Sequence, residues 1–282
     1  MDKQDLFADL HIHSIYSDGT FTLEEICDMA VCNNVGVIAV TDHNTIAGVK
    51  ALQKIAKERG LCSIAGVELD SLYNGKRCHI LAYKFDPDSK ELAEVAAGNK
   101  SLLDATDINT LNSIAVDYSI DMGQYDSFVF DKNLGGWKLI QFLVAQGVAE
   151  NLDVAVKLMK QYKKRAEFPP AEKIIDVIHR AGGVAILAHP GETFRVDGDG
   201  DEVTDALIMK LVDYGIDGME CYYPRHKLTF EKRLENICTA RGLYRTVGSD
   251  YHGDFFRGSK QKIGCEFKQV KELELKTLLD GE

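Results

Sequence analysis

Short apolar runs alternate with segments of helical periodicity over the first 85 residues of the chain. The runs predict strands, and one helical segment begins after Thr22, where Glu25 completes the pattern of a capping box. Asn74-Gly75 separates the last two apolar runs and predicts a two-residue hairpin turn between them. The strands expected here span residues 6–12, 35–41, 61–69 and 77–84, and a second helix spans 45–59.

The same alternation resumes after residue 170. Strands are expected at 184–188, 215–222 and 243–248, and helices at 169–181, 201–214, 227–241 and 270–279. Alternating strands and helices are typical of an α/β domain in which helices cover a mainly parallel sheet.

The middle of the chain, between about residues 87 and 168, lacks this alternation. It holds no convincing strand, and its periodicity predicts helices at 90–100, 103–118, 136–146 and 152–165. In the last of these, Leu152, Val156 and Met159 form a one-sided apolar stripe. We therefore expect one α/β domain, formed by residues 1–86 and 169–282, that is interrupted by an inserted helical subdomain at 87–168.

Composition limits the classes of function. The chain has 282 residues, of which 45% are apolar and 27% charged, as expected for a folded globular protein rather than a disordered one. Its formal net charge of −11 argues against a long nucleic acid as partner, because such partners require a basic face. No stretch approaches the length of a membrane span, so no membrane partner is expected, and the oligomeric state is left open.

Two features favour a cytoplasmic location. The first residues do not form a signal peptide, and the seven cysteines are odd in number with no Cys-x-x-Cys pair. Most of these cysteines lie inside apolar runs, which indicates buried reduced thiols rather than disulfides or a zinc–cysteine site.

Residue types that bind metals gather at the ends of the predicted strands. His11 and His13 end the first strand, and both side chains project to one side because residues two apart on a strand point the same way. Asp250 and His252 repeat this spacing after the last strand. In parallel α/β barrels the carboxyl ends of the strands meet at one mouth, where active sites lie. The nine residues expected to share one metal-binding pocket are His11, His13, Asp18, His43, Glu68, His79, His189, Asp250 and His252.

Taken singly, several of these residues have a plainer interpretation. His79 fits a hydrogen-bonded core histidine, Glu68 a salt-bridged strand end, and Asp18 a turn residue before glycine. However, six of the eight histidines fall at predicted strand ends or within strands, which coincidence explains poorly. His179, by contrast, is expected on a solvated helix face.

Three kinds of metal site could use such a donor set. A structural site closes with four ligands and does not need nine. An amidohydrolase-type site shares the His-x-His motif and usually adds a bridging lysine or carboxylate, but here Asp18, His43 and His252 would be surplus. A phosphoesterase site uses several cations to activate water and neutralise phosphate, so nine ligands without a cysteine among them favour this third kind.

The nine residues stand within longer motifs. These are Asp9-Leu10-His11-Ile12-His13-Ser14, Ser17-Asp18-Gly19, Thr41-Asp42-His43-Asn44, Gly66-Val67-Glu68, His189-Pro190 and Gly248-Ser249-Asp250-Tyr251-His252. In these motifs, and in His79, the chain resembles the PHP (polymerase and histidinol phosphatase) superfamily, over residues 5–85 and 170–255. The resemblance implies a distorted (β/α)7 barrel, here with the helical insertion, and a trinuclear site for Mn2+, Fe2+ or Zn2+.

The resemblance also implies which residues act together. One metal would be held by His11, His13, Glu68 and Asp250, a second would be surrounded by Asp18, His43 and His252, and a third would be completed by Glu68, His79 and His189. Glu68 would bridge two of the metals. Asp18, His43 and His252 are in addition the residues expected to be catalytic.

Within the superfamily, the helical insertion resembles that of the stand-alone metal-dependent phosphoesterases. The resemblance implies hydrolysis of small phosphate esters, such as nucleoside 3′,5′-bisphosphates, cyclic nucleotides or sugar phosphates, by attack of a metal-bound hydroxide on phosphorus. The segment from Gly135 through Trp137 and Lys138 to Leu143 resembles the helix that covers the site in these enzymes. The alternatives are a histidinol-phosphate-type phosphomonoesterase, a 5′–3′ exonuclease on short RNA, and a metal-binding scaffold without activity.

Some residues outside the ligand set are expected to bind the substrate. Arg195, Arg225 and His226 are predicted to bind its phosphate, because a guanidinium fork suits phosphate, and His226 could also protonate a leaving alkoxide.

Other residues are expected to support the site. Asp9 and Asp42 are predicted to accept hydrogen bonds from the second ring N–H groups of ligand histidines. Trp137, Tyr222 and Tyr223 could stack on a substrate ring, although core packing is the favoured role for these three.

Overall fold

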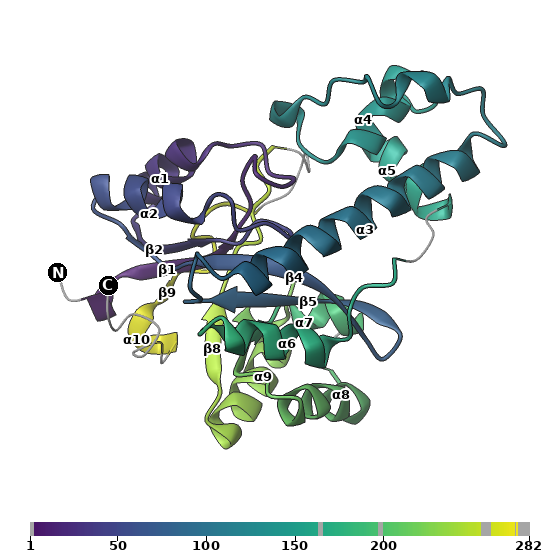
Figure 1. Cartoon of the computed structure of the whole chain (residues 1–282). Helices are drawn as coiled ribbons and strands as arrows, with labels where there is room; N and C mark the ends of the chain where they lie inside the picture. The colour runs from purple at the N-terminus through teal and green to yellow at the C-terminus, as the bar shows by residue number, and fades with distance from the viewer. Residues whose placement is uncertain (1–2, 163–165, 197–199, 255–260, 274, 276–282) are drawn as a thin grey trace.

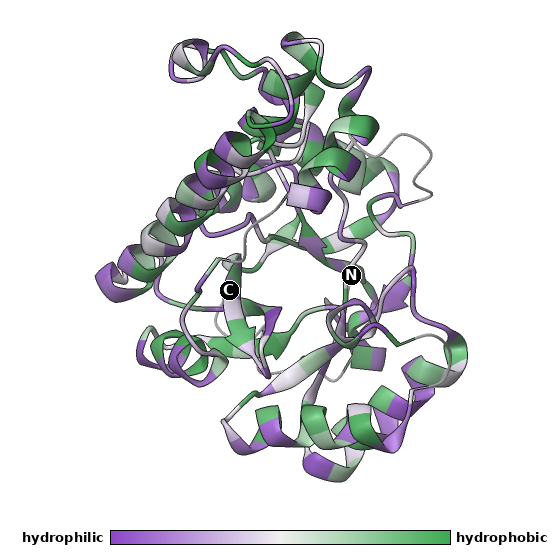
Figure 2. Cartoon of the chain, turned by 90° about the vertical axis from the view of Figure 1, so that its right-hand side faces the viewer, coloured by the Kyte–Doolittle hydropathy of each residue, from purple (hydrophilic) through white to green (hydrophobic). Residues whose placement is uncertain are grey.

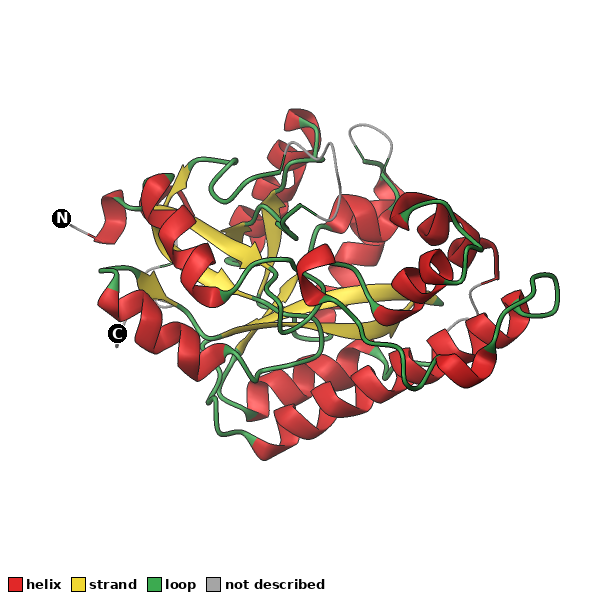
Figure 3. Ribbon diagram, turned by 90° about the horizontal axis from the view of Figure 1, so that it is seen from above, coloured by secondary structure: helices red, strands yellow, loops and turns green. Residues whose placement is uncertain are grey.

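Two sheets organise the molecule, and helices lie on both sides of the strands (Figures 1 and 3). The computed structural model describes residues 3–162, 166–196, 200–254, 261–273 and 275. The strand orders are β3-β2-β1-β9 in one sheet and β4-β5-β6-β7-β8 in the other. A short 3-10 turn, η1 at Lys3–Asp5, precedes the first strand.

The first sheet is built from the N-terminal part of the chain and is completed by a strand near its end. Its strands are β1 (Phe7–Ile12), β2 (Val35–Val40), β3 (Cys62–Ser63) and β9 (Lys268–Gln269). Its helices are α1 (Leu23–Cys32) and α2 (Val49–Glu58). The predicted capping box is confirmed, since Thr22 accepts from the Glu25 amide at 3.2 Å and donates its own amide to the Glu25 carboxylate at 2.8 Å.

The second sheet contains the remaining strands. These are β4 (Gly66–Tyr73), β5 (Lys76–Tyr83), β6 (Val184–Leu187), β7 (Gly218–Tyr222) and β8 (Tyr244–Val247). The helices that follow or precede them are α6 (Ala171–Arg180), α7 (Pro190–Phe194), α8 (Glu202–Asp213), α9 (Leu228–Arg241) and α10 (Val270–Leu273). The end of the helix predicted at 270–279 lies outside the described residues.

The α/β class is confirmed, but the sheets are mixed and do not close into a continuous ladder. β1–β2, β2–β3, β6–β7 and β7–β8 are parallel, whereas β4–β5, β5–β6 and β1–β9 are antiparallel. The expectation of a mainly parallel sheet is therefore confirmed only in part, since four of these seven strand pairings are parallel. The antiparallel pairing of β4 with β5 has a cause that is visible in the sequence. The two-residue turn at Asn74-Gly75 returns the chain directly beside itself, as only antiparallel strands allow.

The strand predicted at 61–69 is in fact two strands in different sheets. β3 pairs with β2, and after Ile64 and Ala65 the chain enters β4, which pairs with β5. Two isolated bridges join the sheets, Ile12 with Tyr251 and His43 with Glu68. All four bridge residues lie in or beside the predicted metal-binding motifs. The metal-binding residues are consequently gathered where the two sheets meet.

The helical insertion leaves the second sheet after β5 and returns at α6 (Figure 1). Its first helix, α3 (Lys90–Ile114), is one continuous helix where two were predicted. Ser101, at the expected break, fits inside the helix because its hydroxyl donates to the carbonyl of Ala97 at 3.0 Å. The other elements are η2 (Met122–Gln124), η3 (Lys132–Leu134), α4 (Lys138–Ala145) and α5 (Leu152–Tyr162). Residues 163–165, the end of the last predicted helix, lie outside the described part.

The insertion has a hydrophobic core of its own. Leu111, Ile114, Phe142 and Met159 belong to a buried cluster where α3, α4 and α5 meet, and hydrophobic residues gather there in Figure 2. The start of α3 belongs to the main core instead, through Leu92 and other residues of its first turns. α3 therefore joins the two cores as one rigid element.

Among the described residues, no helix combines the length and the apolar character needed to cross a bilayer. All seven cysteines are free, in agreement with the predicted reduced thiols. The cytoplasmic location inferred from them stays a prediction.

Candidate metal centre

The His11-Ile12-His13 and Asp250-Tyr251-His252 motifs lie side by side. The Asp250 amide donates to the carbonyl of His11 at 2.8 Å, and the His13 amide donates to the carbonyl of Tyr251 at 2.9 Å. This pairing extends β1 toward the segment after β8, so that His11, His13, Asp250 and His252 face one another. Asp250 has a φ of 51°, a left-handed conformation that a non-glycine residue adopts only where its surroundings hold it.

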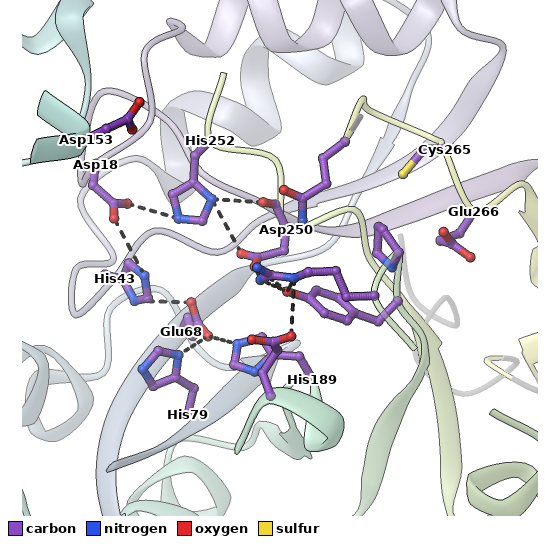
Figure 4. Close-up of a pocket in the computed structure, with 15 residues that line it drawn as sticks. Asp18, His43, Glu68, His79, Asp153, His189, Asp250, His252, Cys265 and Glu266 are labelled. Carbon is purple, nitrogen blue, oxygen red and sulfur yellow. Dashed lines mark hydrogen bonds and ion pairs between the residues drawn. The ribbon is translucent and has the colours of Figure 1, made fainter. Parts of the chain in front are cut away.

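Glu68 lies at the centre of the site, with histidines directed at both of its oxygens (Figure 4). Its Oε2 is 3.3 Å from His11 Nε2, 3.3 Å from His13 Nε2 and 3.1 Å from His43 Nδ1. Its Oε1 is 2.7 Å from His79 Nδ1 and 3.1 Å from His189 Nε2. A carboxylate whose two oxygens face different groups of histidines is placed to bridge two cations.

Asp18 and Asp250 supply the other carboxylates. Asp250 Oδ1 lies 3.3 Å from His13 Nε2 and 3.5 Å from His252 Nδ1. Asp18 approaches three rings, with distances of 3.5 Å to His252, 3.7 Å to His13 and 3.8 Å to His43. The structure therefore brings Asp18 to the outer side of the site, next to the His43 and His252 rings.

Three groups of ligand atoms are close enough to share an ion. They are His11-His13-Glu68-Asp250, His13-Asp18-His43-His252 and His43-Glu68-His79. The first matches the expected set, the second adds His13, and the third contains His43 where His189 was expected. His189 lies beside these groups, with its ring against Glu68, and its buried Nδ1 has no hydrogen-bond partner in the described part of the chain.

Several buried ring nitrogens in this cluster have no hydrogen-bond partner among the described residues. These include His11 Nε2, both ring nitrogens of His13, and His43 Nδ1, together with Glu68 Oε2. Buried polar atoms normally find partners, and leaving one without costs on the order of 1–3 kcal/mol. Nitrogen and carboxylate donors that converge without bonding one another fit divalent cations, so the residues present suit the metals that the sequence predicts.

The electrostatics of the cluster keep its carboxylates ionised. Burial by itself raises the pKa of Glu68, but the surrounding His43, His79 and His11 outweigh it and hold that pKa well below its ordinary value. Burial lowers the pKa of His43 to about 4, which keeps this ring neutral and available as a ligand. Burial opposes but does not prevent a rise in the pKa of His13 to about 10, which the nearby carboxylates of Asp250 and Glu68 cause.

Glu220, within the strand predicted at 215–222, supports the site although no role for it was predicted from the sequence. One carboxylate oxygen lies 3.0 Å from His11 Nδ1, and the other accepts the backbone amide of His189 at 2.8 Å. A Cβ on Gly248 would come within 2.3 Å of this carboxylate and 2.2 Å of the His11 Cβ, so only glycine allows the approach. Glu220 therefore orients His11 and leaves its Nε2 facing the cluster.

We expect Glu220→Gln to weaken metal binding by about 10- to 100-fold, because groups that orient metal-binding histidines commonly contribute that much. The measurement is a titration of metal-free protein with Mn2+ followed by calorimetry. Glu202→Gln, an exposed change at the start of α8, is the matched control and should bind Mn2+ as the unaltered chain does. Equal affinities for both variants would contradict the role of Glu220.

The roles predicted for Asp9 and Asp42 are wrong in detail. Asp9 accepts backbone amides from Gly264 at 2.7 Å and Ser249 at 3.0 Å rather than a histidine ring N–H. Asp42 accepts from the backbone amide and hydroxyl of Ser14 and from the Ser17 hydroxyl. Both carboxylates thus hold the loops that carry the ligands, because the nearest donors are the backbone and hydroxyl groups of those loops.

A cavity of about 840 Å³ opens over the cluster (Figure 4). Arg225 lines it, lying over the Tyr223 ring at 5.3 Å and close to Glu192 at 3.4 Å and Asp250 at 3.7 Å. Tyr223 lines the same cavity, and its hydroxyl donates to Asp250 Oδ2 at 3.1 Å. Asp153 reaches this cavity from α5 of the insertion, a residue that sequence reasoning did not single out.

The other two residues predicted to bind phosphate are placed differently. Arg195 is exposed at the end of α7 and is not part of the cavity lining. His226 is turned into the protein, where Nδ1 donates to the carbonyl of Cys221 at 3.0 Å and Nε2 accepts the Gly191 amide at 3.1 Å. With both ring nitrogens bonded to backbone, His226 holds α7 against the loop after β7 rather than facing the cluster.

A second cavity, of about 560 Å³, runs from the cluster beneath the insertion. It shares Asp18 and His43 with the first, so the two are continuous at the metal-binding residues. Its walls combine aromatic, cationic and acidic side chains. They include Tyr16, Arg77, Lys100, Asp104, Asp107, Tyr125, Asp126, Phe130, Trp137 and Lys138.

Comparison with known proteins gives the family. The model of the PHP domain family matches residues 9–207. The chain belongs to the PHP domain family. A phosphoribosyl 1,2-cyclic phosphate 1,2-diphosphodiesterase of Eggerthella lenta is 25% identical to this PHP chain over 89% of its length and 96% of the relative. A 5′–3′ exoribonuclease of Haemophilus influenzae is 31% identical over 86% of this chain and 89% of the relative.

A solved structure shows the same fold. The crystal structure of a protein from Bifidobacterium adolescentis, assigned as a metal-dependent phosphoesterase, superposes with a TM-score of 0.77 at 24% identity, over 95% of both chains. The predicted family, and with it the predicted classes of phosphoesterase and hydrolase, is thereby confirmed.

Proposed function

We propose that this PHP-family chain hydrolyses a phosphate ester of a small molecule at a centre of three divalent cations. The observation that supports this most strongly is Glu68, a fully buried carboxylate with five histidines within 3.3 Å of its oxygens. No single ion needs so many donors around one bridging group.

We assign the ligands by the three groups of close donors. Glu68 belongs to two of the groups, Asp250 completes one of these, and Asp18 completes the group without Glu68. His189 supports Glu68 from the side. Nitrogen and oxygen donors without thiolate suit Mn2+, Fe2+ or Zn2+. Bound divalent ions supply Lewis acidity, which lowers the pKa of water and neutralises phosphate charge. Asp18, His43 and His252 line the open side of the cluster and are our candidates for contact with the reacting groups.

Arg225 is our candidate for binding the phosphate. Among the described residues it is the one arginine that lines the cavity over the cluster, and its side chain is 56% exposed. The Tyr223 ring and Glu192 hold its guanidinium at the cavity wall. A fork of N–H donors at this position can bind two phosphate oxygens at once.

The insertion, residues 87–168, is proposed to cover the leaving group. The amide of Gly136 donates to the Asp18 carbonyl at 3.2 Å, so the start of α4 is attached directly to a ligand residue. Gly136 and Asp18 both line the second cavity, and Tyr16 and Trp137 line it as well. Aromatic walls next to the cluster favour a substrate that carries a ring, such as a nucleotide, over a sugar phosphate alone.

The charges of the second cavity disfavour a long polyanion. Asp18, Asp104, Asp107 and Asp126 line it together with three cations, and one of these, Lys138, already lies over the Tyr125 ring at 4.8 Å. The chain as a whole has a net charge of −11. A long nucleic acid would gain little from released counterions on such a surface.

The test is a substrate panel with Mn2+ at matched salt. It compares kcat/KM for nucleoside 3′,5′-bisphosphates, cyclic nucleotides, ribosyl cyclic phosphate, histidinol phosphate, short RNA with a 5′-phosphate, and long RNA. We expect the nucleotide esters to lead. Preference for a long polymer by about tenfold or more would overturn the small-molecule proposal, and no turnover of any ester would favour the scaffold alternative.

Trp137→Ala tests the role of the insertion. Stacking on an aromatic side chain contributes about 1–3 kcal/mol per base, so kcat/KM for a nucleotide should fall by roughly 5- to 150-fold. For a ribosyl phosphate, which has no base, it should change little. Tyr118→Ala removes an exposed aromatic ring of the insertion that lines neither cavity, and it should leave both substrates unaffected. Equal losses on both substrates would contradict a ring-binding wall.

A further inference from the structure

Asp70 is a buried carboxylate beside the metal centre that is not one of the predicted ligands. It is fully buried on β4, two residues after Glu68, and therefore projects to the same side of the strand. Its Oδ1 lies 3.2 Å from His79 Nε2, while His79 Nδ1 faces Glu68 at 2.7 Å. Asp70 thus orients the His79 ring so that Nδ1 is the nitrogen directed at the cluster.

Asp70 also holds the residue next to His43. Asn44 donates its side-chain amide to Asp70 Oδ2 at 2.6 Å and accepts the Asp70 backbone amide at 3.0 Å. Its own backbone amide donates to the Glu68 carbonyl at 2.9 Å, and its φ of 51° places it in the left-handed region. Asp70 therefore orients both histidines of the group His43-Glu68-His79, one through its ring and one through its backbone.

Asn99 connects this arrangement to the insertion. It lies on α3, is 1% exposed, and donates its side-chain amide to Asn44 Oδ1 at 3.1 Å and to the Asp70 carbonyl at 2.7 Å. Its own Oδ1 is buried with no hydrogen-bond partner among the described residues. Because a half-satisfied buried amide is unfavourable for packing alone, the two donated hydrogen bonds are the feature that accounts for an asparagine here.

Both ends of the insertion contact the β4–β5 hairpin close to Asp70. α3 enters with Asn99 and continues to Leu111 in the core of the insertion. At the returning end, Phe168 lies beneath the guanidinium of Arg77 at 5.5 Å, and Arg77 donates to both oxygens of Asp70. The Leu72 amide donates to the Pro169 carbonyl at 2.9 Å. The contacts of the insertion therefore converge on the residue that orients His43 and His79.

We propose that Asn99 is a positioning residue through which α3 of the insertion sets the affinity of one metal position, that of His43, Glu68 and His79. The inference rests on the proposed metal centre. Without Asn99, Asn44 and Asp70 lose their link to α3, and the two histidines lose part of their orientation. The position of His11, His13, Glu68 and Asp250 has no contact with Asn99 among the described residues and does not use His43, so it keeps its affinity. The position of His13, Asp18, His43 and His252 shares His43 and is weakened less.

The experiment measures metal occupancy rather than activity. Wild-type and Asn99→Ala proteins are dialysed against a buffered series of free Mn2+, and bound manganese is counted by atomic emission. We expect three equivalents for the wild type. For the variant, the equivalent held by His43, Glu68 and His79 should be lost at free Mn2+ about 10- to 100-fold higher than in the wild type. The position that shares His43 should weaken less, and the position of His11 and Asp250, which does not use His43, should be unchanged. Activity lost at low Mn2+ should return at saturating Mn2+.

Two further variants separate positioning from stability. Thr110→Ala removes a buried hydroxyl from the same helix, which donates to the Thr106 carbonyl of α3 at 2.7 Å, and it should leave all three equivalents in place. Asn99→Leu fills the space left by the amide, so it tests the loss of the donors where alanine destabilises the fold. It should reproduce the loss of one equivalent.

The outcomes are distinct. A wild type with three equivalents and an Asn99 variant with an unchanged isotherm would overturn the positioning role and leave the proposed function intact. Equal weakening of all three positions would show a general loss of structure and would also overturn it. A wild type that binds one equivalent or none would overturn the metal centre itself, and the inference with it.

Discussion

Glu68→Gln is expected to lower kcat/KM by about 10³-fold or more and to reduce bound manganese by at least one equivalent. The glutamine keeps the shape of the side chain but removes the negative charge that faces five histidines. A metal centre contributes several kcal/mol to the transition state, and each 1.36 kcal/mol corresponds to a factor of ten in rate. The measurements are kcat/KM on a nucleotide ester with Mn2+ and the metal content of the purified protein.

The matched control for Glu68 is another glutamate of the same cavity. Glu266 lines the cavity but is outside the groups of close ligand atoms, so Glu266→Gln should keep its metal content and most of its activity. A Glu68→Gln protein that retains the full metal content and a similar rate would falsify the bridging role. Circular dichroism of each variant checks that the fold is preserved.

Arg225→Met is expected to lower kcat/KM by about 10- to 150-fold with metal content unchanged. Hydrogen bonds to charged groups contribute about 1.5–3 kcal/mol, and methionine preserves much of the packing against the Tyr223 ring while removing the guanidinium. Arg225→Lys should recover only part of the loss, because an ammonium group keeps the charge but not the planar fork. Steady-state kinetics on one phosphate ester at fixed salt measures both variants.

Arg195 provides the comparison for Arg225. Sequence reasoning gave the two arginines the same role, but Arg195 is exposed outside the cavity. Arg195→Met should therefore leave kcat/KM within about twofold, as for surface changes away from a site. If instead Arg195→Met is the damaging change and Arg225→Met is silent, the proposed phosphate position is wrong.

Local patterns were sufficient for much of the fold. The capping box at Thr22 and the turn at Asn74-Gly75 were predictable because each depends on residues a few positions apart. The strand at 61–69 was predicted as one element because an apolar run does not show which sheet each half joins. That division depends on pairing with β2 on one side and β5 on the other.

The residues that orient the metal-binding histidines could not be predicted from local patterns. Glu220 contacts His11 across 209 residues of sequence, and Asn99 contacts Asn44 across 55. The sequence predicts that His226 binds phosphate together with Arg225, because both residues follow the strand expected at 215–222. Only the folded chain shows that both ring nitrogens of His226 form hydrogen bonds, one with the Cys221 carbonyl and one with the Gly191 amide.

Which donors this protein can offer follows from local sequence, since strand ends carrying His-x-His, Asp-x-His and single histidines and carboxylates are a local property. The tertiary structure alone decided which donor atoms meet. It set His43 beside Glu68 and His79, left His189 at the edge, and turned Asp70 and Asn99 toward the site from outside. The physical reason is that hydrogen bonding and ion binding act over about 3 Å, a distance that only the packing of remote segments can establish.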